Sequence, residues 1–160
     1  MKTIEVVELF AILKDLKLSG LNTTDRLKII KNLRALREVA EKYNNDIELA
    51  KERLKPDGYD NLVMKMLESN EAVAAGGNRT VSDLELASFN RMHEGFNRDL
   101  KAIQAGSYNK EEERFEGGMN DEPVEVALET LTGSAFDKLV ESNKDVPAGA
   151  LAVLYDKIVK

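Results

Sequence analysis

The chain has no cysteine and a single histidine, and both scarcities restrict its chemistry. Without cysteine it has no disulfides, thiolate zinc sites, iron–sulfur clusters or thiol nucleophiles. This composition suits a reducing compartment, so we expect a cytoplasmic protein. His93 is the only side chain that could supply an imidazole base or metal ligand.

Long apolar runs are also missing. No stretch approaches the roughly 18 apolar residues of a membrane-spanning helix. The apolar start of the chain is interrupted by Glu5, Glu8, Lys14 and Asp15, whereas a signal peptide needs an uninterrupted apolar core. The sequence therefore predicts neither a membrane span nor secretion.

The net charge of −6 is unevenly distributed along the chain. Residues 1–55 carry a small excess of Lys and Arg, whereas residues 106–160 carry a clear excess of Asp and Glu. A polyanionic partner for the whole chain is therefore disfavoured.

Apolar periodicity predicts a mainly helical, all-α chain that folds as one domain over residues 1–160. Helices are expected over 3–18, 22–55, 59–75, 82–105, 134–142 and 148–159. The second is the longest, with an apolar seam at spacings of three and four, and Pro56 and Gly58 follow it. Ser82 and Glu85 form a capping box for the fourth. We expect an antiparallel helical bundle over 1–105 around the long second helix.

The helical periodicity of apolar residues is absent from residues 106–122, which are glycine-rich and acidic. This segment is predicted to be a flexible loop. Residues 123–129 alternate weakly between apolar and polar, which fits a short strand as well as the start of a helix. The fold prediction therefore includes one short strand or hairpin near 113–129.

The first and last predicted helices are apolar around most of their circumference. A surface helix cannot tolerate this, so each must be covered on several sides. We expect residues 123–160 to pack back on the first helix, with Phe10 and Leu13 near Leu151, Leu154 or Ile158. The alternative is that one of these faces forms a dimer interface.

Four features could carry chemistry, and each has a simpler structural explanation. His93 lies on the apolar seam of its helix, and a di-iron site would need further histidines and glutamates. An acidic run lacks the alternating ligands of a calcium loop. Residues 76–80 precede a helix start, where an anion could bind, but they lack the P-loop pattern. A basic stripe could contact phosphates but has no interleaved aromatic residues. The acidic run comprises Glu111, Glu112, Glu113, Glu116, Asp121 and Glu122, and the stripe comprises Arg26, Lys28, Lys31, Arg34 and Arg37.

The opening segment, IEVVELFAILKDLKLSGLNTTDRLKIIKNLRALREVAEKYNNDIELAKERL, resembles the start of small uncharacterised phage and prophage proteins often encoded near tail genes. Residues 136–159 are loosely similar to the same proteins. The resemblance covers about half of the chain and implies a virion-assembly or accessory role, with a virion location as an alternative to the cytoplasm. The resemblance implies no functional residues for this chain.

These patterns predict a non-enzymatic helical protein that binds another protein or a second copy of itself. No catalytic, cofactor or metal residue is expected. The leading alternative is a nucleic-acid-associated regulator that uses the basic stripe. A third class is an enzyme whose acidic residues converge only in the fold.

Overall fold

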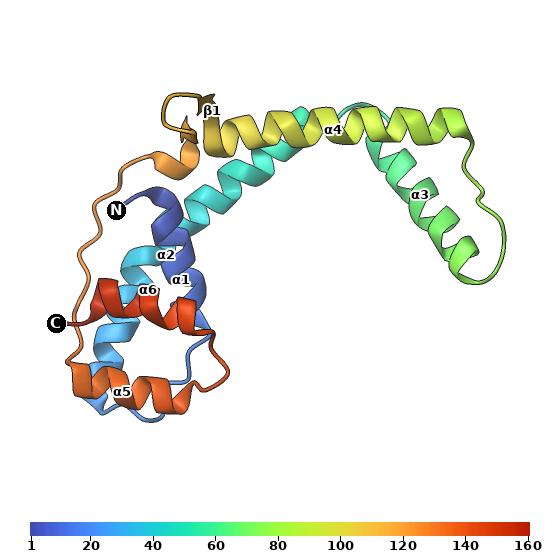
Figure 1. The fold of residues 1–160 in the computed structure, drawn as a ribbon. Helices are drawn as coiled ribbons and strands as arrows, with labels where there is room; N and C mark the ends of the chain where they lie inside the picture. The colour runs from blue at the N-terminus through green and yellow to red at the C-terminus, as the bar shows by residue number, and fades with distance from the viewer. The chain divides into compact units, whose positions relative to one another are not determined.

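A computed structural model describes all residues, 1–160. The chain is mainly helical, with six α-helices and one small antiparallel hairpin, so the expected helical class is confirmed (Figure 1). It divides into two compact units, one of residues 1–46 and 119–160 and the other of residues 47–118. The division falls within the long helix α2 (Thr23–Leu54), whereas the sequence placed its boundary after residue 105.

Helix α1 spans Thr3–Lys14, and the prediction that it continues to Leu18 was wrong. The reason is a tertiary contact at Lys17. Its backbone N–H donates to the side-chain oxygen of Asn143 at 2.8 Å, and its carbonyl accepts from the Asn143 amide at 2.9 Å. Because both peptide groups are used in this way, the chain leaves the helical path and turns toward α2.

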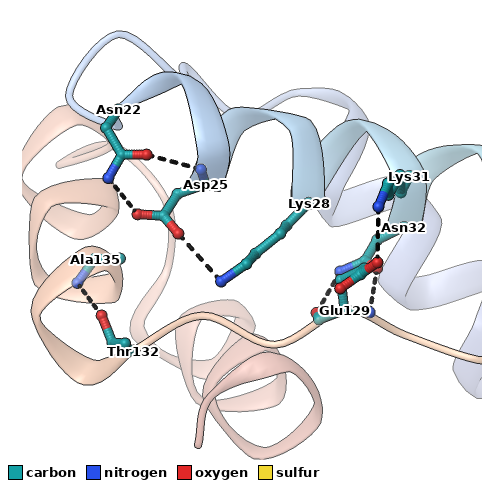
Figure 2. A network of polar contacts seen from close by, with 8 residues as sticks. All are labelled: Asn22, Asp25, Lys28, Lys31, Asn32, Glu129, Thr132 and Ala135. Atoms are coloured by element: carbon teal, nitrogen blue, oxygen red, sulfur yellow. Dashed lines mark hydrogen bonds and ion pairs between the residues drawn. The ribbon is translucent and has the colours of Figure 1, made fainter.

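Asn22 caps the start of α2, the helix that the sequence places over 22–55. Its side-chain oxygen accepts from the Asp25 backbone N–H at 2.9 Å, and its amide donates to the Asp25 carboxylate at 2.8 Å (Figure 2). Lys28 lies 3.4 Å from the same carboxylate. The negative charge therefore lies where the helix dipole favours it.

The core of the first unit joins both ends of the chain. It contains side chains from α1, from α2, from α5 (Gly133–Ser142) and from α6 (Ala148–Ile158). Phe10 and Leu151 pack against it, and Lys157 of α6 pairs with Glu5 of α1 at 2.9 Å. Its buried members are Val6, Leu9, Leu13, Leu21, Ile29, Leu36, Leu131, Ala135, Phe136, Leu139, Leu154 and Ile158.

Residues 122–131 cross this unit without forming a helix or a strand (orange in Figure 1). Val124, Val126 and Leu128 pack on the core, which accounts for the alternation in the sequence. Backbone hydrogen bonds secure the segment near both ends, at Val124 to Met1 (2.8 Å) and at Leu131 to residue 158 (2.7 Å). Neither predicted element forms, because no neighbouring strand extends the pairing and the peptide groups bond to other parts of the chain.

Asn32 of α2 secures the middle of that segment. This side chain is only 1% exposed. Its amide donates to the Glu129 carbonyl at 2.9 Å, and its oxygen accepts from the Glu129 N–H at 2.7 Å (Figure 2). Asn32 therefore replaces the pairing that a neighbouring strand would give.

The second unit contains α3 (Tyr59–Ala74), α4 (Asp83–Ala105) and a hairpin of β1 (Gly106–Asn109) and β2 (Arg114–Gly117). The prediction of a loop without regular structure over 106–122 was wrong, since the hairpin and a short 3-10 helix, η1 (Met119–Asp121), lie within it. Tyr108 pairs with Phe115 across the strands, with ring centroids 5.1 Å apart. The Asn109 side chain accepts from the Glu111 N–H at 2.9 Å and so organises the turn.

Candidate functional site

Helices α3 and α4 form an antiparallel pair. Near the start of α3, Tyr59 lies beside Phe89, with ring centroids 6.1 Å apart. One to two turns further along α3, Lys65 pairs with Glu85 at 2.6 Å. Near its end, the buried Ser69 hydroxyl accepts from the Thr80 N–H at 3.0 Å.

No apolar side chain of either helix is fully buried. Ser69 is the only buried residue of α3, and α4 has none. Two helices alone cannot enclose a core, because each apolar stripe must be covered on more than one side. The inward residues of this pair therefore remain partly exposed to solvent.

A hollow of about 380 Å³ lies between the two helices. We call it the α3–α4 groove. Its lining residues are Gly58, Asn61, Leu62 and Lys65 on one side and Leu84, Glu85, Ser88 and Met92 on the other. Leu84 is 76% exposed, the highest value of any large apolar residue in the chain, and Met64 and Leu67 are exposed on the outer surface of α3. An exposed apolar side chain beside a hollow with polar lining residues, as Leu84 is here, is compatible with a binding surface.

Glu85 and Lys65 are charged side chains in this groove. The hydrogen bond from Lys65 and, next, the bond from the Ser82 backbone N–H at 3.0 Å lower the pKa of Glu85. Glu85 is therefore an anion bound to its own helix start and to α3. It is part of the scaffold and is not poised as a general acid.

His93 lies among Tyr59, Phe89 and Phe96 but is exposed, so it is an edge residue of the pair. Its Nδ1 lies 2.8 Å from the Tyr59 hydroxyl and its Nε2 lies 3.0 Å from the Asn97 amide. Both ring nitrogens thus have neighbours, which agrees with the prediction of a packed edge histidine bonded to nearby residues. A metal would have to displace one of these contacts.

The acidic run is spread over two units. Glu111, Glu112 and Glu113 form the hairpin turn, where Arg114 pairs with Glu112. Asp121 lies in the first unit and pairs with Lys2 at 2.6 Å. Nowhere in the chain do three or more His, Cys, Asp or Glu side chains form a group that could hold a metal ion.

The turn over residues 76–80 does not offer an open anion site. The Ser82 hydroxyl accepts from the Glu85 N–H at 3.1 Å, and the Glu85 carboxylate accepts from the Ser82 N–H. Asp83 also lies in this first turn and pairs with Arg79. Two carboxylates therefore already occupy the positive end of α4.

The basic stripe of α2 is largely neutralised by local partners. Arg26 donates hydrogen bonds to the carbonyls of Ser19 and Leu21. Lys28 pairs with Asp25, and Lys31 pairs with Glu129 at 3.0 Å. Arg37 lies 3.9 Å from Glu41. Arg34 alone has neither a hydrogen bond nor an ion pair. The five cations seen in the sequence therefore do not form a free phosphate-binding row.

The first unit has a smaller hollow of about 280 Å³ beside α2. Its apolar walls include Val39, Met119 and Val124. The Tyr43 hydroxyl donates to the Asn120 side chain at 2.6 Å. The hydrogen bond with Asp46 raises the pKa of Lys42. Since these polar groups are already paired, we regard the α3–α4 groove as the stronger candidate.

The groove was not found from the sequence. Leu62, Met92 and Leu86 follow the same helical spacing as core residues, so the pattern predicts burial for all of them. Leu84 was the available signal, because it lies two residues after the capping residue Ser82 and off the apolar stripe of its helix.

No protein-family model matches the chain, and no match was found among curated proteins or solved structures. None of the helices combines the length and apolar content that a membrane span requires.

Proposed function

We propose that the chain is a non-enzymatic protein-binding module with an assembly or accessory role, and that it binds its partner through the α3–α4 groove. The observation that carries this proposal is the absence of any fully buried apolar side chain in α3 or α4, together with the exposure of Leu84. Covering this surface with another protein would remove apolar area from water, which stabilises a complex.

The local pairing of the basic stripe supports a protein partner over a nucleic acid. A phosphate contact by Lys31 would have to replace its ion pair with Glu129. A phage or prophage origin is part of this proposal, and its support is the resemblance of the opening segment and of residues 136–159.

Site-specific photo-crosslinking tests the proposal. A photoreactive amino acid replaces Asn61 in one variant and Leu84 in another, and Val153 of α6 in a control. All three side chains are exposed, but only the first two line the α3–α4 groove. In cells that naturally produce the protein, we expect the same discrete protein adduct from the first two positions and none from the control. Equal adducts from all three positions, or none at all, would contradict the proposal.

A further inference from the structure

We propose that the turn between α2 and α3 is a site of spontaneous backbone modification, at which the Asp57–Gly58 peptide bond rearranges to an isoaspartyl linkage. This inference goes beyond the proposed function and does not depend on what binds the α3–α4 groove. The residue that follows Asp57, the exposure of the turn and the single backbone bond that closes it carry the inference.

The sequence restricts this reaction to one peptide bond. Asp57 is the only aspartate that glycine follows, and no asparagine precedes glycine or serine. In this reaction the backbone nitrogen of the following residue attacks the side-chain carboxyl carbon, so a side chain on that residue hinders the approach. Gly58 has no Cβ and leaves the approach open.

The chemistry is an intramolecular condensation followed by hydrolysis. The Gly58 nitrogen forms a bond to Cγ of Asp57, the Cγ–OH bond of the carboxyl group breaks, and water leaves with the amide proton. Water then adds to either carbonyl carbon of the resulting ring. Cleavage of the nitrogen–Cγ bond restores aspartate, whereas cleavage of the original peptide bond leaves the chain running through Cγ, which is the isoaspartyl form. The reaction needs no cofactor and no oxidant.

The reacting groups are exposed and have no other partners. Asp57 and Gly58 are both exposed, and the Asp57 carboxylate makes neither a hydrogen bond nor an ion pair. The Gly58 N–H donates to no acceptor in the protein. Asp145 differs in both respects, although it too is exposed in a turn, because Val146 follows it and its carboxylate pairs with Lys17 at 3.2 Å.

The turn must rotate before the ring can close, and little opposes that rotation. Gly58 has φ of 78° and ψ of −1°, the values of the third residue of a type II turn over residues 56–59. In such a turn the Asp57 side chain is not aligned with the Gly58 nitrogen. One backbone bond closes the turn, from the Tyr59 N–H to the Pro56 carbonyl at 3.1 Å. Breaking one such bond lowers the reaction rate by about tenfold at most.

The isoaspartyl linkage would change the start of α3. It adds one atom to the main chain between Pro56 and Tyr59, so the turn cannot keep its present geometry. The Gly58 carbonyl accepts from the Leu62 N–H at 3.1 Å, and both of these residues line the α3–α4 groove. The modification therefore alters one end of that groove as the protein ages.

Ageing of the full chain tests the proposal. The protein is kept at neutral pH for several weeks beside a free peptide of residues 54–61, and isoaspartate is located by electron-transfer mass spectrometry. We expect isoaspartate at position 57, at a rate no more than about tenfold below that of the peptide, and none at Asp145. Accumulation in the peptide but not in the folded chain would overturn the proposal, as would equal accumulation at Asp145.

Asp57→Glu is the matched control variant. It keeps the charge, but its longer side chain would have to close a larger ring, which forms far more slowly. In ¹⁵N NMR spectra, the aged parent protein should give a second set of amide signals for Tyr59 and Leu62, whereas the aged variant should give one set. Second signals of equal intensity in the variant would overturn the proposal, and isoaspartate without second signals would refute the effect on the groove.

Discussion

Two buried asparagines hold non-helical segments against the first unit by imitating backbone pairing. Asn32 binds the peptide groups of Glu129, and Asn143 binds those of Lys17. An asparagine can do this because its side-chain amide presents one acceptor and a donor in the same geometry as a peptide group. Both are at most 2% exposed, so their polar atoms depend on these bonds.

Replacement of Asn32 by alanine should therefore destabilise the protein by about 2–3 kcal/mol. The change removes two hydrogen bonds and leaves the Glu129 N–H and carbonyl without their partner. Urea unfolding measures the effect. Asn44→Ala is the matched control, because Asn44 lies exposed on the same helix and should change the stability by less than about 0.5 kcal/mol. Similar losses in the two variants would refute the role assigned to Asn32.

Glu5 should make a small, pH-dependent contribution to stability. The Lys2 backbone N–H and, next, the Lys157 side chain lower the pKa of this carboxyl group. Since the folded-state pKa is the lower one, the stabilisation is present above the ordinary pKa of glutamate and is lost as the pH falls through the folded-state value. The ion pair is partly exposed, so we expect less than about 1 kcal/mol.

The variant Glu5→Gln keeps an acceptor for Lys2 but removes the charge. It should be less stable than the parent at neutral pH and should match it in strong acid, as measured by urea unfolding at several pH values. Glu8→Gln, at an exposed position of the same helix, should follow the parent throughout. A constant difference between Glu5→Gln and the parent at every pH would contradict the electrostatic explanation.

At the scale of elements, the hairpin after α4 depends on two glycines. Gly106 has φ of +80°, and a Cβ there would collide with the Glu116 carbonyl. Gly118 is buried, and a Cβ there would collide with the backbone of Gln104 and Gly106. These close approaches bring β1 and β2 together directly after the helix.

The variant Gly118→Ala should therefore disrupt the hairpin. We expect loss of the cross-strand contacts between Tyr108 and Phe115 in NMR spectra, while the amide signals of α1 persist. Gly149→Ala is the control, because nothing lies within 4 Å of a Cβ at that helical position and alanine there should be neutral or slightly stabilising. Retention of the Tyr108–Phe115 contacts in Gly118→Ala would show that the chain can move to accept the methyl group.

Element boundaries were predictable where local chemistry determines them. Asn22 and Ser82 cap α2 and α4, and Pro56 and Gly58 follow the end of α2. Helix α5 begins at Gly133, one residue before the expected start, and Thr132 caps it. The end of α1 and the path of residues 122–131 were not predictable, because Asn143 and Asn32 determine them from distant parts of the sequence. A strand or hairpin was expected near 113–129, and β2 lies within that range, but the hairpin begins earlier, at Gly106. Its first strand was assigned to a loop because its few apolar residues and three adjacent glutamates resemble a disordered segment, whereas Asn109 and close backbone packing organise it.

At the scale of the whole molecule, the two units differ in how they bury apolar surface. In the first unit, the sequence indicated that both chain ends need covering, and the shared core of α1 and α6 provides this. In the second unit, the same helical periodicity leaves α3 and α4 without a fully buried apolar side chain. A periodic pattern identifies which face of a helix is apolar, but it does not identify what covers that face, so the groove emerged only from the structure.

This difference predicts unequal local stability within one chain. Local opening costs least where few apolar side chains are buried, so amides of α3 should exchange with solvent faster than those of α1 and α6. Leu154 of α6 is fully buried in the first unit. Leu154→Ala should lower the opening free energy of α1 and α6 by about 2–5 kcal/mol through loss of apolar contacts and the resulting cavity.

Amide exchange followed by NMR tests whether that loss stays in the first unit. Because the cavity lies in a core to which α3 and α4 contribute no side chain, exchange in those two helices should be unchanged by Leu154→Ala. The two parts of helix α2 should respond differently, since the boundary between the units falls within it. In Leu154→Ala, amides before residue 47 should exchange faster than in the parent protein, and amides after it should exchange at the parental rate. Val153→Ala, at an exposed neighbour of Leu154, should leave all of these rates near parental values. A uniform increase from α1 to α4 in Leu154→Ala would mean that the long helix couples both units into one cooperative fold, and the α3–α4 pair would then owe its stability to the first unit rather than to a partner.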